Sequence, residues 1–146
     1  MKKILSVTVT GCLLALMVAF TVRAQEPGAA MRASIPFEFT VSGRTLPSGN
    51  YEIRRLGDDA MTLIIRNVDH KRDEAVFTTE PYIEGKTPGH SEIVFHRYGD
   101  NTFLSEVVTA GSETARELLP SRTERRLRRE LASNNAQPET VALAVY

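Results

Sequence analysis

The chain has 146 residues and balances 18 basic against 18 acidic side chains. This length fits one domain and is enough to bury a hydrophobic core without covalent cross-links. The single cysteine, Cys12, excludes an intramolecular disulfide and a site built from several thiolates.

Residues 1–24 are typical of an export signal. A basic start precedes a long apolar run, and the small side chain of Ala24 predicts cleavage before Gln25. Cleavage would remove Cys12 and three of the positive charges, so residues 25–146 keep 15 basic and 18 acidic side chains, a net charge of −3. The sequence therefore predicts a thiol-free, weakly acidic protein that is periplasmic or secreted.

Two alternatives for this segment stay open. Residues 9–12 resemble a loose lipobox in which Cys12 would be lipidated, although the apolar run before it is shorter than usual. An uncleaved membrane anchor is the other alternative, because residues 4–22 approach the length of a membrane span. The mass of the mature N-terminus distinguishes these alternatives from cleavage.

The fold class predicted for residues 35–132 is all-β with one C-terminal helix, after a small, polar leader over residues 25–34 that is expected to be flexible. Apolar and polar side chains alternate with period two, as in half-buried strands, and turn residues separate the runs. This spacing predicts an antiparallel meander, either a small barrel or a sandwich. The six predicted strands are 35–41, 51–54, 61–66, 74–79, 91–98 and 102–109.

The last part of the chain has a different pattern. Ser121 and Glu124 form a capping box, which predicts a helix over residues 122–132. Two leucines four residues apart form a narrow apolar stripe, which we expect to lay this helix on the sheet or over a barrel end. Residues 133–146 are predicted as a linker followed by a short apolar tail, which adds an edge strand.

The predicted helix also carries the densest charge of the chain, with five arginines and two glutamates in residues 121–132. It is a candidate anion-binding face for phosphate-rich lipid headgroups, polyanionic glycans or an acidic partner. The alternative is a solvated helix whose cations complement its own C-terminal dipole and an acidic sheet. No nucleic acid is expected as a partner of an exported chain. The five residues are Arg122, Arg125, Arg126, Arg128 and Arg129.

The sequence lacks the common catalytic and cofactor motifs, namely a serine-hydrolase elbow, a phosphate-binding loop, a zinc-protease HExxH and a dinucleotide fingerprint. His90, Glu92 and His96 are metal-ligating residue types. On one extended strand, however, positions 90 and 96 lie about 20 Å apart, too far to share a metal. We therefore predict no catalytic residue, no metal and no cofactor.

Residues 35–51 read IPFEFTVSGRTLPSGNY. They resemble the motif IPF-x-F-x-V-x-G-x-x-LP-x-G-x-Y of a group of small exported bacterial proteins. Residues 95–99 and 121–126 are also similar, so the resemblance covers residues 35–130. That group has no assigned activity, so the resemblance implies an exported β-rich fold and no catalytic residue.

These observations predict an exported, non-enzymatic binding module of the envelope or the secreted fraction. Its expected partner is an unknown envelope protein or an anionic surface, with membrane contact at most peripheral once the signal is cleaved. The alternative is a small apolar-ligand carrier of the β-barrel type, which needs an enclosed apolar cavity on the order of 300 Å³ or more. A hydrolase with an unrecognised site is the third hypothesis.

Overall fold

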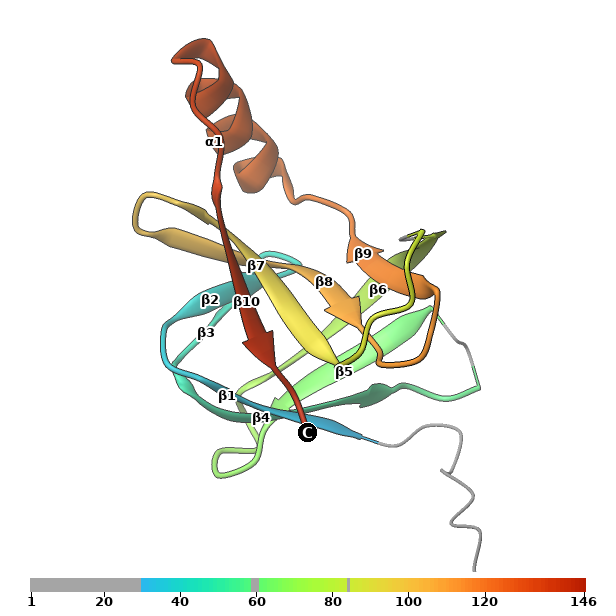
Figure 1. Ribbon diagram of the computed structural model, residues 1–146. Coiled ribbons are helices and arrows are strands. Elements are labelled where there is room, and N and C mark those ends of the chain that lie inside the picture. Colours follow the sequence, from blue (N-terminus) through green and yellow to red (C-terminus); the bar gives the residue numbers. More distant parts are fainter. Residues whose placement is uncertain (1–29, 59–60, 84) are drawn as a thin grey trace, which may run out of the picture.

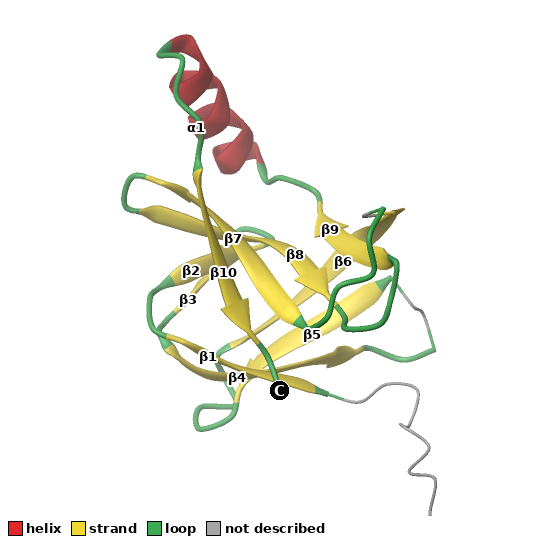
Figure 2. Cartoon of the chain, in the orientation of Figure 1, coloured by secondary structure: helices red, strands yellow, loops and turns green. Residues whose placement is uncertain are grey.

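The computed structural model describes residues 30–58, 61–83 and 85–146, so the predicted export signal and the first half of the predicted leader lie outside the described residues. The described chain is mostly β-sheet with one C-terminal helix (Figures 1 and 2). Its elements are β1 (Met31–Ile35), β2 (Phe39–Val41), β3 (Arg44–Leu46), β4 (Gly49–Arg55), β5 (Thr62–Asn67), β6 (Glu74–Ile83), β7 (Glu92–Tyr98), β8 (Asn101–Val108), β9 (Thr114–Leu118), α1 (Arg122–Ser133) and β10 (Glu139–Ala144).

The strands form one open, mixed sheet. Its order is β1-β4-β5-β6-β9-β8-β2-β3, and β7 joins β8 and carries β10 on its other side. Within the described chain, the strands pair antiparallel except where β2 meets β8 in parallel, with Thr40 beside Phe103. Two backbone hydrogen bonds of 2.9 and 3.0 Å join Arg32 of β1 to Tyr146, which follows β10. They link the outermost strands β1 and β10.

The prediction of a β-rich domain is confirmed, but the predicted six-stranded meander is wrong in its connectivity. β6 pairs with β9, and β10 pairs with β7, so several neighbours in the sheet are distant in the sequence. The strand β9 was not predicted, because only Ala115 and Leu118 of its five residues are buried. An alternating pattern identifies a strand, but the choice of its partner depends on contacts elsewhere in the chain.

The predicted strand over residues 35–41 is two strands separated at Pro36. β1 ends at Ile35 and β2 begins at Phe39, because a proline has no backbone N–H to continue a ladder. β1 also includes the last residues of the predicted leader, where Ala33 is buried in the core. The leader expected over residues 25–34 therefore gives way to the sheet at Met31.

The N-terminal motif over residues 35–51 is a structural unit. Gly43, with a φ of +84°, takes the left-handed conformation that the tight turn between β2 and β3 requires. The Tyr51 hydroxyl donates to the carbonyl oxygen of Pro47 at 2.7 Å. A Cβ on Gly49 would lie 2.6 Å from Nδ2 of the buried Asn67 side chain, which would have to shift to admit it. The motif thus serves turn geometry and core packing.

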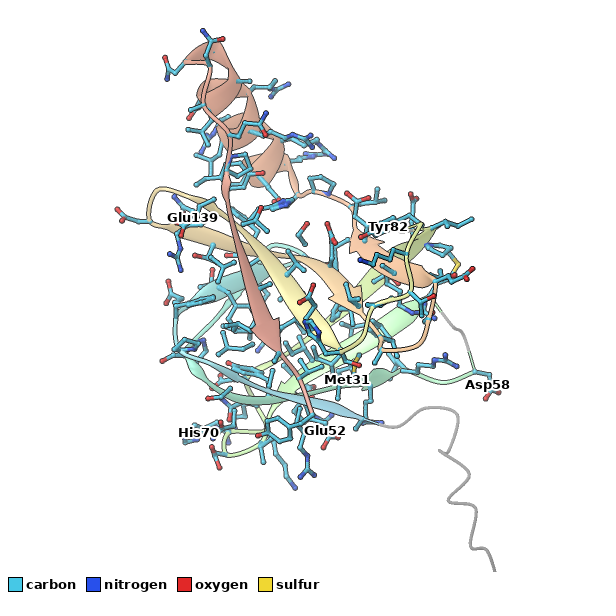
Figure 3. The ribbon with its side chains drawn as sticks, in the orientation of Figure 1. Met31, Glu52, Asp58, His70, Tyr82 and Glu139 are labelled. Carbon is cyan, nitrogen blue, oxygen red and sulfur yellow. The ribbon has the colours of Figure 1, made fainter. Side chains whose placement is uncertain are left out.

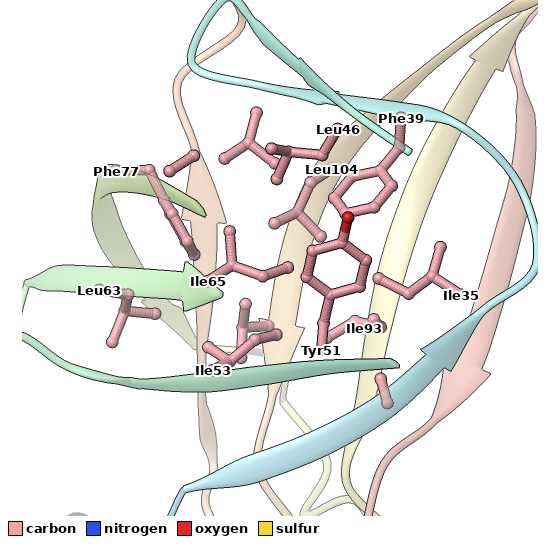
Figure 4. Close-up of a cluster of buried hydrophobic side chains, with 14 of the residues drawn as sticks. Ile35, Phe39, Leu46, Tyr51, Ile53, Leu63, Ile65, Phe77, Ile93 and Leu104 are labelled. Carbon is pink, nitrogen blue, oxygen red and sulfur yellow. The ribbon is translucent and has the colours of Figure 1, made fainter. Parts of the chain in front are cut away.

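The core lies between the β1-β4-β5 side of the sheet and the β7-β8 side (Figure 4). Edge-to-face aromatic contacts run through it, with ring centroids 5.2 Å apart for Phe37–Phe95, 5.4 Å for Phe95–Phe39 and 5.2 Å for Phe39–Tyr51. Each such contact adds stability beyond the burial of apolar area. The fully buried aliphatic side chains around these rings include Ile35, Val41, Leu46, Ile53, Ile65, Ile93 and Val107.

The helix prediction is confirmed to within one residue, since α1 covers Arg122–Ser133. Its position differs from the expectation, because α1 stands out from one end of the sheet instead of lying on it (Figure 1). Leu127 and Leu131 are only half-buried, and Glu124 is the one buried residue of the helix. Two leucines bury too little apolar surface to hold a whole helix against the sheet.

The apolar tail adds a strand, as predicted. β10 pairs antiparallel with β7 over six residues, and Val141, Leu143 and Val145 pack against the core. Glu139 begins this strand (labelled in Figure 3) and forms an ion pair with Arg97 of β7, with 3.3 Å between Oε2 and Nη1. The tail is therefore part of the domain, and α1 with its return segment is an excursion between β9 and β10.

Candidate binding site

The sheet side of the candidate site lies where β7 and β10 meet the base of α1. Phe95 of β7 points into the core, so His96 is directed to the opposite face. His96 is paired with Thr140 of β10 on one side and with Phe103 of β8 on the other. The Tyr98 ring contacts the Phe103 ring edge-on, with centroids 5.8 Å apart.

A pocket of ≈ 360 Å³ lies between these strands and the helix. Arg128 and Ala132 line it from α1, and residues 136–138 line it from the segment that returns to β10. His96, Tyr98 and Thr140 complete its wall on the sheet side. Three separate parts of the sequence therefore build one pocket.

Glu124 lies beside His96 at the base of α1. Its backbone N–H donates to Oγ of Ser121 at 3.1 Å, and its carboxylate accepts from the Ser121 N–H, which completes the predicted capping box. Its Oε1 lies 3.9 Å from Nδ1 of His96. Burial raises the pKa of Glu124 above its usual 4.5, against the lowering effects of the Ser121 N–H and the Arg128 guanidinium. This carboxylate is thus a helix cap whose charge is partly desolvated.

Tyr98 is 5 % exposed. Burial raises the pKa of its hydroxyl above 10.0, the Glu124 charge raises it further, and Arg128 acts in the opposite direction. The phenol is therefore protonated at neutral pH and offers its O–H to the pocket as a hydrogen-bond donor.

The structure divides the five predicted arginines. At about 100° per residue, four of them fall within one sector of α1 about 100° wide. Arg128 falls outside this sector, on the side of the helix that carries Glu124, and it lines the pocket. All five are exposed. The anion-binding face of five arginines therefore stays a prediction, and the structure places four of these residues in one sector of α1 and Arg128 beside the pocket. The four residues of this arginine face are Arg122, Arg125, Arg126 and Arg129.

Two of these arginines have short local contacts. Nη1 of Arg125 donates to the carbonyl oxygen of Pro120 at 2.9 Å, and Nε of Arg126 lies 3.7 Å from Oε1 of Glu130. Both contacts are exposed and are worth little in water, because solvent and salt screen them. The guanidinium groups therefore exchange these contacts for an incoming anion at small cost.

The other residues considered for a metal lie apart. His90 contacts Glu92, with 3.2 Å between Nε2 and Oε2, whereas His96 faces Glu124. Within residues 30–58, 61–83 and 85–146, no three His, Cys, Asp or Glu side chains converge on a metal position. In the same ranges no helix combines the length and the apolar character needed to cross a bilayer.

The sequence did not reveal the pocket. Among the residues that line it, the sequence predicts only Arg128 as a site residue, and His96 enters the sequence analysis only in the metal set that its distance from His90 excludes. One signal was present, since the capping box predicts a glutamate turned back toward the start of the helix. The pocket itself depends on the pairing of β7 with β10, which local patterns do not encode.

Comparison with known proteins adds no assignment. No protein-family model matches the chain. Neither a curated protein nor a solved structure matches it. The interpretation of both parts of the site therefore rests on their own geometry and chemistry.

Proposed function

We propose that the chain is an exported, non-enzymatic binding module that docks through α1 onto an anionic membrane surface. The observation that carries this proposal is the arginine face, four exposed guanidinium groups on one side of a helix that stands clear of the sheet. Guanidinium groups bind phosphate oxygens in a bidentate manner, so a row of them suits a surface of lipid headgroups.

The position of the arginines along α1 favours docking over the alternative of a solvated, self-complementing helix. Cations stabilise a helix when they lie in its last turn, beside the unpaired carbonyl groups. The last turn of α1 contains no basic residue, whereas Arg122 and Arg125 lie near its N-terminus. There a cation is unfavourable to the helix dipole, so these charges do not serve the stability of α1.

The charge of the rest of the molecule supports one orientation at the surface. Residues 121–132 carry a net charge of +3, and the remainder of residues 25–146 carries −6. An anionic surface therefore attracts the helix and repels the sheet. Each arginine near such a surface contributes about 1 kcal/mol, so the four contribute about 4 kcal/mol, which gives reversible, salt-sensitive binding.

The core packing favours this reading over an apolar-ligand carrier. The buried Phe39 ring contacts both Tyr51 and Phe95 in the core, where a carrier would need open space. We also propose that the sheet is a small, incompletely closed barrel, supported by the backbone link between Arg32 and Tyr146. Membership in the group with the IPF motif is part of the same proposal, and the structural roles of Gly49 and Tyr51 support it.

Vesicle binding tests the proposal. The full chain is mixed with vesicles of phosphatidylcholine alone and with vesicles containing an equal amount of phosphatidylglycerol, and the bound fraction is measured by sedimentation. We expect binding only to the anionic vesicles, with loss at high salt. The double variant R122Q/R129Q should bind about 30-fold more weakly, because two contacts are lost.

The matched control is R54Q/R55Q, which removes the same charge from two exposed arginines of β4, away from α1. This control should bind as the parent chain does. Equal binding to both vesicle types, no binding to either, or equal loss in both double variants would contradict docking through the arginine face.

A further inference from the structure

The pocket at the base of α1 is separate from the arginine face and has its own chemistry. The described residues that line it include hydrogen-bond donors on three sides, and no Asp or Glu is among them. The donors are the guanidinium of Arg128, the imidazole of His96, the hydroxyls of Tyr98 and Thr140, and the side-chain amide of Gln137. A wall with one permanent cation and several donors favours a ligand that accepts hydrogen bonds and carries negative charge.

The nearby carboxylate does not oppose such a ligand directly. Oε1 of Glu124 lies 3.9 Å from Nδ1 of His96, and the Glu124 carboxylate accepts from the Ser121 N–H. It is 6 % exposed and is not among the residues that line the pocket. A ligand in the pocket therefore meets Arg128 before it meets Glu124.

The remaining wall is apolar and small. Ala132, Ala136 and Pro138 present methyl and ring carbons to the pocket, opposite the sheet side chains. The volume of ≈ 360 Å³ lies at the lower end of the range of about 300–1,000 Å³ found for small-molecule sites. This space suits a compact molecule with a short carbon body and is too small for a long lipid chain.

We propose that this pocket binds a small organic anion, with its carboxylate or phosphate group on Arg128 and its carbon body against Ala132, Ala136 and Pro138. Tyr98 and Thr140 donate to the same anionic group or to a polar substituent beside it. The proposal is independent of membrane docking, because Arg128 lies outside the arginine face. An occupant would contact β7, α1 and the return segment together, and it would stabilise the folded chain by an amount that grows with the logarithm of its concentration once the pocket is mostly filled.

The experiment is a ligand titration of the isotope-labelled full chain followed by NMR. The probes are butyrate, hexanoate and benzoate as carboxylates, and inorganic phosphate and butyl phosphate as phosphates. Butylammonium and butanol match the carbon body without the negative charge. We expect saturable shifts of the backbone amides of Ala132, Gln137 and Thr140 with at least one anionic probe, and none with butylammonium or butanol.

Substitution of Arg128 makes the test specific. The variant Arg128→Gln should weaken binding of the same probe at least about tenfold, as expected for the loss of a charged hydrogen bond of 1.5–3 kcal/mol. The control Arg55→Gln removes an exposed arginine of β4 and should leave the affinity unchanged. Arg128 is exposed, so its replacement is not expected to unfold the chain. Circular dichroism verifies this.

The relative affinity of the carboxylate and phosphate probes identifies the anionic group. Absence of saturable shifts with every anionic probe would overturn the proposal. It would also be overturned by equal binding of butanol, or by unchanged affinity in a folded Arg128→Gln variant.

Discussion

The sheet and the helix of this protein are stabilised in different ways. The sheet buries a continuous set of apolar side chains around the aromatic rings of Phe39, Tyr51 and Phe95. The helix α1 buries only Glu124 and directs four arginines into solvent. Buried apolar contacts therefore stabilise mainly the sheet, whereas the helix carries the densest group of exposed charged side chains.

This difference has a consequence for how each region tolerates change. An isolated helix of 12 residues is marginal in water, so α1 depends on its cap and on its attachment to β9 and β10. Its outward side chains make few contacts whose loss would unfold the domain. We therefore expect substitutions in the sheet core to alter stability, and substitutions on the outer face of α1 to alter binding.

The largest expected effect is in the aromatic core. Phe39→Ala should lower the free energy of unfolding by about 3–5 kcal/mol, because it removes a fully buried ring that contacts both Tyr51 and Phe95. Urea unfolding followed by circular dichroism measures the change. The control Val76→Ala, at a side chain 48 % exposed, should change stability by less than about 0.5 kcal/mol. Similar effects of both substitutions would contradict a sheet-centred core.

The second effect concerns the start of α1. Ser121→Ala should cost about 1 kcal/mol, because the Glu124 N–H loses its 3.1 Å acceptor at the helix N-terminus. Chemical unfolding measures this cost, and helical circular dichroism reports on local fraying. Ser133→Ala is the control, since its hydroxyl contacts Glu130 at the exposed far end of the helix. An equal loss of stability in Ser133→Ala would show that the Ser121 cap does not contribute specifically to the stability of α1.

The third effect is a pH dependence from Glu124. Its raised pKa means that the folded chain binds this proton more tightly than the unfolded chain does. Glu124 therefore does not lower the free energy of unfolding at a pH well below 4.5. The free energy that it costs grows as the pH rises from 4.5 through its folded-state pKa. The stability of the parent chain relative to Glu124→Gln should fall as the pH rises above 4.5, and the fall should end once the folded-state pKa is passed.

The neighbours of this carboxylate determine how that experiment is designed. His96, Arg128 and Glu117 face Glu124, and a charge on the His96 imidazole would act directly on this carboxylate. The comparison is therefore made in the His96→Gln background, by urea unfolding at each pH. A relative stability that is constant or rises with pH would show that burial does not dominate the titration of Glu124.

The smallest effect is expected on the arginine face. Arg122→Gln should leave stability unchanged or raise it by about 0.3–1 kcal/mol, because a cation in the first turn opposes the helix dipole. Arg126→Gln should lower it by about 0.3–0.5 kcal/mol through loss of the pair with Glu130. Thermal unfolding of both variants measures these differences. A loss above about 1 kcal/mol at Arg122 would mean that this face has a structural role.

Local patterns in the sequence determined much of the secondary structure. Runs of β-branched and aromatic residues between turn residues place β5, β7 and β8 within a residue of their observed bounds, although both faces of these strands are buried over part of their length. The capping box places the start of α1 at Arg122, because the hydrogen bonds of the cap lie within four consecutive residues. The cluster of arginines was also visible, since charge density along a helix is a local property.

Only the tertiary structure decided how these elements are arranged. The pairing of β6 with β9 and of β10 with β7, and the parallel contact of β2 with β8, join distant segments whose selection depends on the whole core. The same pairing placed His96 beside Thr140 and left Arg128 over a pocket while its neighbours faced solvent. Side-chain periodicity records which face of an element is buried, but it carries no information about which other element covers that face.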